Sequence, residues 1–411
     1  MSASATRSNP HAFYGWFVVA AAFAVTFVGF GCAYTFSAFV RSLQQDFGAS
    51  RGSVSLVFSL AGFLYFGLGS VSGALADRFG AHRLAVGGMV ITGLGLAAAG
   101  AAQRLSEVYA AYGLGVGVGV GCAYVPAVAV VQRWFVRQRG FASGLAVSGI
   151  GIGTLVMPPL ASLLISWLGW RHAYLVLGGF AALVGGGMAL LIEDDPRNRG
   201  QAPDGDLAAP GTQSPSGMSV REAITSRRFL GLYMACLICS FGAFIPFVHL
   251  VPYALDHGIP QASAVMLLGA VGVGSTGGRF FLGSLADRTG RPASLAAMFA
   301  GMALALASWA WSTSIFALVA FALIYGVFYG GWVAILPAVA MDYFGGRHIS
   351  GIIGILYTSV AIGTLIGPSA AGFAFDAWHN YMPPIAAGAC ANLIAAAIVG
   401  RMARTPDRSP S

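Results

Sequence analysis

The chain has 411 residues, of which 57% are apolar and only 9% carry a charge, and its mean hydropathy is +0.76. A soluble domain carries about 25% charged residues, roughly 100 in a chain of this length, whereas this sequence has 22 basic and 14 acidic side chains. So few charges cannot cover a water-exposed surface, and so much apolar surface cannot stay unburied as in a disordered chain. The composition excludes a soluble enzyme, a nucleic-acid-binding protein and a secreted disulfide scaffold, and it predicts a protein whose solvent is lipid.

Twelve apolar runs are long enough to cross a bilayer, which takes about 20 residues in a helix. They are 13–40, 52–76, 83–102, 105–132, 140–166, 171–192, 229–255, 261–286, 292–311, 315–342, 348–375 and 380–402. The polar segment 193–228, rich in Pro, Gly, Ser and Asp, is typical of a flexible linker. The sequence therefore predicts an all-α membrane protein with an N-terminal six-helix bundle (1–192), a cytoplasmic linker (193–228) and a C-terminal six-helix bundle (229–411).

The basic residues, all of them arginine, predict the orientation of these helices. If both termini are cytoplasmic, 17 arginines fall in cytoplasmic segments and four, Arg41, Arg51, Arg104 and Arg171, fall in outer ones. Positive residues are concentrated on the cytoplasmic side of membrane proteins, so this orientation is favoured. The arginines lie in small groups between apolar runs, a distribution typical of loops that face an anionic lipid leaflet.

Three motifs recur in the second half of the chain at an offset of 210 or 211 residues. The pairs are GALADRFG at 73–80 with GSLADRTG at 283–290, PAVA at 126–129 with PAVA at 337–340, and IGTL at 152–155 with IGTL at 362–365. Repeats that are six helices apart have the same orientation in the membrane. The motif G-x-L-A-D-R-x-G in both halves of a twelve-helix chain resembles the major facilitator superfamily. Asp77, Arg78, Asp287 and Arg288 are expected to form its conformational motif, in which the carboxylates pair across the cytoplasmic seam or cap a helix.

Arg279 is the one arginine that falls deep within an apolar run, and all 14 acidic residues fall in loops or at the ends of runs. An unpaired arginine at the middle of a bilayer costs about 2.5–3.5 kcal/mol on insertion scales. A side chain that reaches the interface is the alternative, but about 11 Å of helix separates this residue from Asp287. Glycines at 272, 274, 277 and 278 are expected to leave room for a ligand. A buried guanidinium attracts an anion and fits a carboxylate, so we expect a substrate with one negative charge.

His249 and four tyrosines are further candidates for the substrate site. His249 titrates near neutral pH and lies between Pro246 and Pro252, in a segment expected to be unwound near the outer mouth. It is predicted to bind substrate or to carry a proton, the alternative being a histidine that hydrogen-bonds carbonyls freed by the prolines. A phenol hydroxyl can orient a carboxylate while its ring excludes water. The tyrosines are Tyr34, Tyr124, Tyr329 and Tyr357, and for each the alternative is core packing.

Residues 134–153 are similar to the fifth-helix signature of the monocarboxylate transporters, with an aromatic pair, a basic cluster and then small residues ending in glycine. Arg279 matches the substrate-binding arginine that this family carries in its eighth helix. The resemblance implies a bacterial transporter of small monocarboxylates, such as lactate or pyruvate, that is coupled to a proton and works by alternating access. At the positions of the lysine and aspartate that animal members use for proton coupling, this chain has Tyr34 and Ser275, which leaves His249 or the substrate as the proton carrier.

The expected partners are a small monocarboxylate anion, H⁺ and the lipid of the bacterial inner membrane. No cofactor, metal or nucleic acid is expected, and we expect a monomer. Two alternatives stay open. One is a carboxylate anion exchanger of the oxalate–formate type, although residues 355–368 lack the lysine of that group. The other is a membrane receptor for an organic acid that transports nothing, since a fold does not determine a function.

Overall fold

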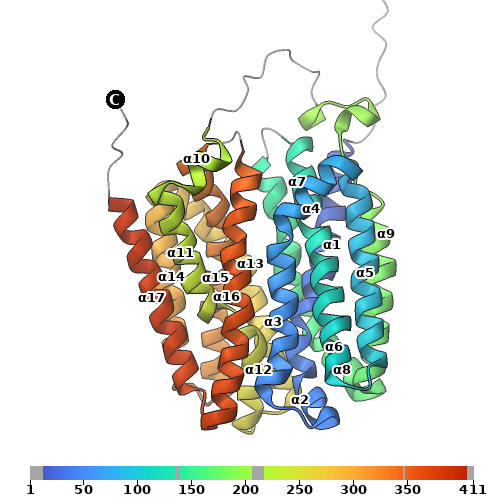
Figure 1. Ribbon diagram of the computed structural model, residues 1–411, viewed down its shortest axis with the longest axis vertical. Coiled ribbons are helices and arrows are strands. Elements are labelled where there is room, and N and C mark those ends of the chain that lie inside the picture. Colours follow the sequence, from blue (N-terminus) through green and yellow to red (C-terminus); the bar gives the residue numbers. More distant parts are fainter. Residues whose placement is uncertain (1–12, 136–138, 206–216, 346–347, 405–411) are drawn as a thin grey trace, which may run out of the picture.

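The computed structural model describes residues 13–135, 139–205, 217–345 and 348–404, and these form a helical molecule (Figure 1). Ten helical segments are long and apolar enough to cross a membrane. One of them, Phe141–Ala189, contains two helices that meet at Gly169, whose φ of 77° breaks the helical path. Residues 51–79 form a further helix of membrane length, interrupted at Leu68. The described residues thus contain the twelve predicted helices, and the all-α class is confirmed.

The N-terminal bundle is coloured blue to green in Figure 1. Its helices are α1 (Gly15–Tyr34), α2 (Phe36–Phe47), α3 (Arg51–Gly67), α4 (Gly69–Phe79), α5 (Ala81–Ala101), α6 (Leu105–Val108), η1 (Tyr109–Val116), α7 (Gly117–Trp134), α8 (Arg139–Phe180), η2 (Ala181–Gly185) and α9 (Gly186–Ala189). The first membrane helix continues beyond the predicted end at residue 40 as far as Phe47. In this extension the side chain of Leu43 is buried, whereas Arg41 and Gln45 are exposed. Within this bundle α1 packs along α8, and α5 packs along α7.

The linker and the C-terminal bundle follow in chain order, and both contain helices. The linker contains η3 (Pro196–Arg199), η4 (Pro203–Gly205) and α10 (Val220–Ile224), and the bundle contains α11 (Arg227–Ala243), α12 (Ile245–Asp256), α13 (Gln261–Thr289), α14 (Arg291–Trp309), α15 (Ile315–Phe344), α16 (Ile349–Trp378) and α17 (Met382–Arg404). The side chain of Ser219 and that of Glu222 form a capping box that starts α10. In the bundle α13 packs along α15, and α14 packs along α17.

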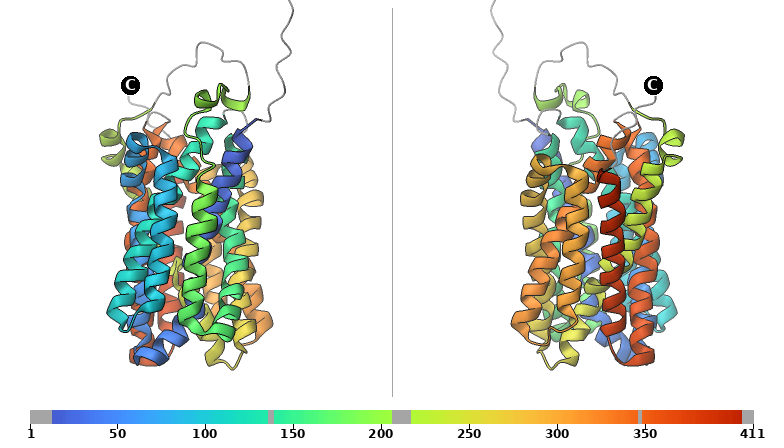
Figure 2. Two further views of the ribbon diagram at one scale, coloured as in Figure 1. Left: turned by 90° about the vertical axis from the view of Figure 1, so that its right-hand side faces the viewer. Right: turned by 90° about the vertical axis from the view of Figure 1, so that its left-hand side faces the viewer.

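The two bundles meet chiefly along α3 with α16 and along α8 with α13, and α2 also packs against α12. Figure 2 views the N-terminal bundle and the C-terminal bundle in turn, and the linker helices lie at one end of the molecule in both views. We call this the linker end. The opposite end, where α2 and α12 lie in Figure 1, we call the far end.

One helix breaks at an equivalent point in each repeat. Helices α1 and α2 meet at Thr35, and α11 and α12 meet at Phe244, where φ is −103° and ψ is −2°. The expectation of an unwound segment between the two prolines is wrong. Pro246 lies in the first turn of α12, where its missing N–H leaves no gap in the hydrogen bonding, and Pro252 lies inside the same helix.

The glycines near Arg279 bring helices together, and the expectation that they leave space for a ligand needs correction. A Cβ at Gly278 of α13 would overlap the carbonyl group of Val327 in α15, and one at Gly274 would overlap the carbonyl oxygen of Leu323. Gly272 faces the backbone of α8 in the same manner. These residues allow α13 to approach its two neighbours closely, as small residues do in many membrane helices.

Two adjacent glycines of α5 provide a test of such packing. A Cβ at Gly88 would meet the carbonyl oxygen of Gly119 and the backbone nitrogen of Ala123 at 2.9 Å, whereas nothing lies within 4 Å of one at Gly87. We expect Gly88→Ala to lower the free energy of unfolding by about 1–3 kcal/mol through overpacking. Gly87→Ala should leave it unchanged or raise it by up to about 1 kcal/mol, since alanine favours a helix. Thermal unfolding in detergent measures both variants, and equal melting temperatures would contradict the packing role.

Candidate functional site

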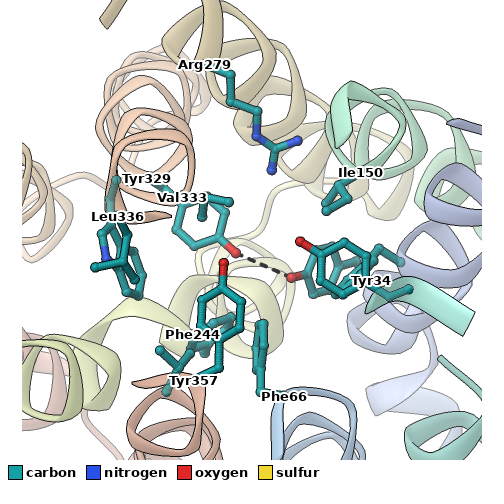
Figure 3. A pocket seen from close by; sticks show the side chains of 13 residues that line it. Tyr34, Phe66, Ile150, Phe244, Arg279, Tyr329, Val333, Leu336 and Tyr357 are labelled. Atoms are coloured by element: carbon teal, nitrogen blue, oxygen red, sulfur yellow. Dashed lines mark hydrogen bonds between the residues drawn. The ribbon is translucent and has the colours of Figure 1, made fainter. Parts of the chain in front are cut away.

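A cavity lies between the two bundles and is lined by side chains from both (Figure 3). Its lining residues are Phe30, Tyr34, Phe66, Tyr124, Ile150, Phe244, Arg279, Tyr329, Trp332, Val333, Leu336, Tyr357 and Val360. The cavity has a volume of about 30 Å³, which is room for no more than a water or two. A ligand of several atoms therefore fits only when the surrounding helices move apart.

Arg279 extends from α13 into this cavity, with its guanidinium group directed toward the tyrosine hydroxyls (Figure 3). The residue is 8% exposed. Its Nη1 donates a hydrogen bond to the carbonyl oxygen of Val147 in α8, at 2.8 Å. Its Nε and Nη2 are buried and have no hydrogen-bond partner among the described residues. The side chain is thus held at one corner by the opposite bundle, while its other donors remain unused.

The two unused nitrogens of Arg279 lie on one edge of the guanidinium plane. Nη1 is on the side of Cδ, so the N–H bonds of Nε and the nearer N–H of Nη2 point in parallel directions. This edge can bind a carboxylate through two parallel hydrogen bonds. A buried N–H without a partner costs about 1–3 kcal/mol, and the described lining contains no carboxylate. The geometry therefore favours an anionic ligand with two adjacent acceptor oxygens.

All four predicted tyrosines line the same cavity, two from each bundle. Tyr34 of α1 and Tyr329 of α15 face each other across the seam, with their hydroxyl oxygens 3.4 Å apart. The hydroxyl of Tyr357, from α16, points toward the same place (Figure 3), and Tyr124 reaches the cavity from α7. These hydroxyls place hydrogen-bond donors beside the guanidinium group, on the helices of both bundles.

His249 does not line this cavity. Its ring is buried at the far end, where Nε2 lies 2.8 Å from the carbonyl oxygen of Pro368 and Nδ1 lies 3.0 Å from the hydroxyl of Tyr381. The structure therefore separates it from the five residues with which the sequence grouped it as a substrate ligand. His249 lies on α12, five residues beyond the cavity-lining Phe244, in the part of the chain that leads to the far end.

The conformational motif lies in the last turn of a helix in each half of the chain. Arg78 is the residue before the end of α4 and Arg288 is the residue before the end of α13, and both are exposed. The side chains of Asp77 and Asp287 lie outside the described part of the structure, so the pairing of these carboxylates stays a prediction.

Sequence reasoning missed the apolar walls of the cavity. Phe30, Phe66 and Phe244 line it, with the ring of Phe66 in contact with the other two rings, and no polar group distinguishes them from other phenylalanines of the chain. One signal was present for Phe244, which lies 210 residues after Tyr34 and so takes the equivalent place in the second repeat.

The unpaired edge of Arg279 predicts a stability effect. We expect Arg279→Met to raise the free energy of unfolding by about 1–3 kcal/mol, because the unpaired buried N–H groups disappear while the volume is kept. Arg51 is the matched control, since its guanidinium donates to both carboxylate oxygens of Asp256. Arg51→Met should lower the stability by leaving that carboxylate without a partner. Thermal unfolding without any added ligand compares the two, and a less stable Arg279→Met protein would contradict the unpaired geometry.

Comparisons with known proteins agree with this architecture. The sequence profile of the Major Facilitator Superfamily matches residues 21–368 and 267–411. Monocarboxylate transporter 3 of Rattus norvegicus is 31% identical over 384 residues, which cover 90% of this chain and 76% of that protein. Monocarboxylate transporter 11 of Homo sapiens is 28% identical over 379 residues, with 89% and 78% covered.

The fold also matches a solved structure over nearly its whole length. This is the crystal structure of a bacterial homologue of the human lysosomal transporter Spinster, in an inward-facing and unoccupied conformation. It superposes with a TM-score of 0.75 at 15% identity and covers 97% of this chain and 98% of that one. The sequence match and the structural match together span both bundles. The protein is thus a multi-pass membrane transporter, not an enzyme, and it belongs to the Major Facilitator Superfamily.

Proposed function

We propose that the protein carries small monocarboxylates, such as lactate or pyruvate, across the membrane together with a proton. The observation behind this proposal is the unpaired edge of Arg279, buried between the bundles. One buried positive charge suits an anion of one negative charge, since a second carboxylate would find no further cation among the described lining residues. The relatives named as monocarboxylate transporters support the same class of substrate.

In this proposal the substrate carboxylate accepts hydrogen bonds from Nε and Nη2 of Arg279. The hydroxyls of Tyr34 and Tyr329, and those of Tyr124 and Tyr357 beside them, donate to its oxygens or to a polar group on the second carbon. The phenyl rings in the cavity wall contact the short alkyl part and exclude water.

Transport in this proposal follows alternating access. The N-terminal bundle (1–192) and the C-terminal bundle (229–411) rock about the seams between α3 and α16 and between α8 and α13. The bond from Arg279 to Val147 crosses one of these seams, so binding at the guanidinium acts on both bundles. The arginine distribution favours a cytoplasmic linker end, and we place the protein as a monomer in a bacterial inner membrane.

His249 is the candidate for the coupled proton. It is fully buried, it titrates in the physiological range when unperturbed, and it contacts Ser55 of the N-terminal bundle as well as Pro368 and Tyr381 of the C-terminal one. The alternative is a proton that travels on the substrate. The two differ in whether the pH dependence of transport survives the change His249→Gln.

Uptake of labelled lactate into proteoliposomes tests the proposed function. We expect uptake to increase when the outside is made acidic, and Arg279→Lys to reduce it at least about tenfold, because lysine keeps the charge but loses the two parallel donors. Arg104→Lys, at an exposed arginine, is the matched control and should transport normally.

Other outcomes would point elsewhere. Uptake that requires an internal carboxylate and ignores the pH gradient would indicate an anion exchanger. Saturable lactate binding without any uptake would indicate a receptor. Near-normal uptake by Arg279→Ala would rule out Arg279 as the ligand of the carboxylate.

A further inference from the structure

Polar contacts join the two bundles at the far end, around the first residues of α3. Nη1 and Nη2 of Arg51 donate to the two carboxylate oxygens of Asp256, at 2.5 and 2.7 Å. The backbone N–H groups of Arg51 and Gly52 donate to the two carboxylate oxygens of Asp376, at 2.9 and 2.8 Å. Nη1 of Arg51 also donates to the hydroxyl of Tyr381, at 3.0 Å. We call Arg51, Asp256, Asp376 and Tyr381 the latch, because separating the bundles here requires these bonds to break.

His249 lies behind the latch, and its hydrogen bonds have fixed directions. The carbonyl oxygen of Pro368 can only accept, so Nε2 of His249, 2.8 Å away, carries the ring proton and donates it. Nδ1 is therefore unprotonated and accepts from the hydroxyl of Tyr381, at 3.0 Å. The oxygen of Tyr381 in turn accepts from Arg51. A one-way chain of donors thus runs from Arg51 through Tyr381 and His249 to Pro368.

A second proton on His249 is incompatible with this chain. Nδ1 would become a donor directed at the oxygen of Tyr381, whose own proton would then lack an acceptor. Only that hydroxyl would separate the imidazolium from the guanidinium of Arg51, in a site where His249 is shielded from water. The carboxylates of Asp256 and Asp376 face the same cluster and bond the side chain and the backbone of α3. Among the described residues, the hydrogen-bond partners of the His249 ring are instead Ser55, Pro368 and Tyr381.

The remaining groups around His249 do not provide an acceptor for a second proton at Nδ1. Ser55 of α3 lies 3.3 Å from Nε2 and donates its own proton to a backbone carbonyl. The phenol ring of Tyr253, on α12, packs against Tyr381 at 5.8 Å between centroids, and the ring of His257 contacts the ring of Tyr253 at 4.3 Å between centroids. Among the described residues, none of these groups accepts a hydrogen bond from Nδ1.

We propose that protonation of His249 at Nδ1 releases the latch and opens the far end between the bundles. The latch re-forms only when the hydroxyl of Tyr381 again donates to Nδ1, which requires the ring to give up the added proton. The proposal rests on the proposed function in one respect, namely that a proton-coupled carrier must link proton binding to the opening of one side. It identifies the closing of the far end as the step that expels the proton.

Distances between spin labels at the far end test this without any substrate. Gln45→Cys in α2 and Ala262→Cys in α13 are exposed positions on opposite bundles, to be used after the five native cysteines are replaced by serine. Pulsed electron–electron double resonance compares the distance between the labels at about pH 7.5 and at about pH 5.5, one unit above and one unit below the ordinary pKa of histidine. Aspartates stay ionised at both pH values. We expect a longer-distance population to grow on acidification. For a single proton, the ratio of open to closed protein changes by at most about tenfold per pH unit.

Three variants identify the responsible group. His249→Gln can donate to Pro368 and accept from Tyr381 but cannot take up a proton, so it should stay closed at both pH values. His257→Gln, at an exposed histidine of the same helix end, should respond like the parent. Asp256→Asn weakens the bond to Arg51 and should show more open protein at both pH values.

Two results would contradict the proposal that protonation of His249 releases the latch. One is a parent protein whose distances do not change with pH, and the other is a His249→Gln variant that responds like the parent. Lactate uptake by the same preparations reports separately on the proposed substrate. Uptake without a pH-dependent distance refutes only the latch, whereas a pH-dependent distance without uptake refutes only the substrate assignment.

Discussion

A guanidinium group with one unpaired edge, buried between two helical bundles, is the constraint on which the rest of the site depends. Burial of such a group in a membrane is unfavourable by about 2.5–3.5 kcal/mol on insertion scales, and the only relief seen for Arg279 among the described residues is the carbonyl of Val147. That carbonyl belongs to the opposite bundle. An anion that completes the hydrogen bonding of Arg279 therefore binds where the bundles meet, next to Tyr34 from one bundle and Tyr329 from the other.

The repeat duplicates the architecture but not the charge. The breaks at Thr35 and Phe244 fall within one residue of the repeat offset, and the cavity-lining residues Tyr34 and Phe244 lie at these breaks. The position 210 residues before Arg279 is Gly69, and among the described residues that line the cavity the one cation comes from the C-terminal repeat. A pair of related bundles with a single buried positive charge has a natural preference for a ligand with a single negative charge, because each unmatched charge in a low dielectric is costly.

The helical fold and the buried position of Arg279 could be predicted from the sequence because a bilayer permits few backbone structures. Backbone groups in a bilayer must be satisfied within a helix, so apolar runs reveal the helices, and a charge inside such a run is rare enough for Arg279 to stand out. His249 was misplaced because its neighbours are remote, with Pro368 and Tyr381 119 and 132 residues further along. The role of the glycines of α13 could not be predicted for the same reason. Spacing alone does not tell whether a bare backbone faces a ligand or another helix, and here Val327 of α15 occupies the space.

The short helix α12 connects the central cavity to the far end. Its flanking residue Phe244 lines the cavity, and Phe247 stacks on Tyr34 with ring centroids 4.6 Å apart. Two residues further on, His249 contacts Tyr381, and the helix ends at Asp256. Helix α12 is separated from α11 by the break at Phe244 and packs against its repeat equivalent α2. In the proposed mechanism, a ligand beside Phe244 and a proton on His249 would therefore act on the same helix of twelve residues.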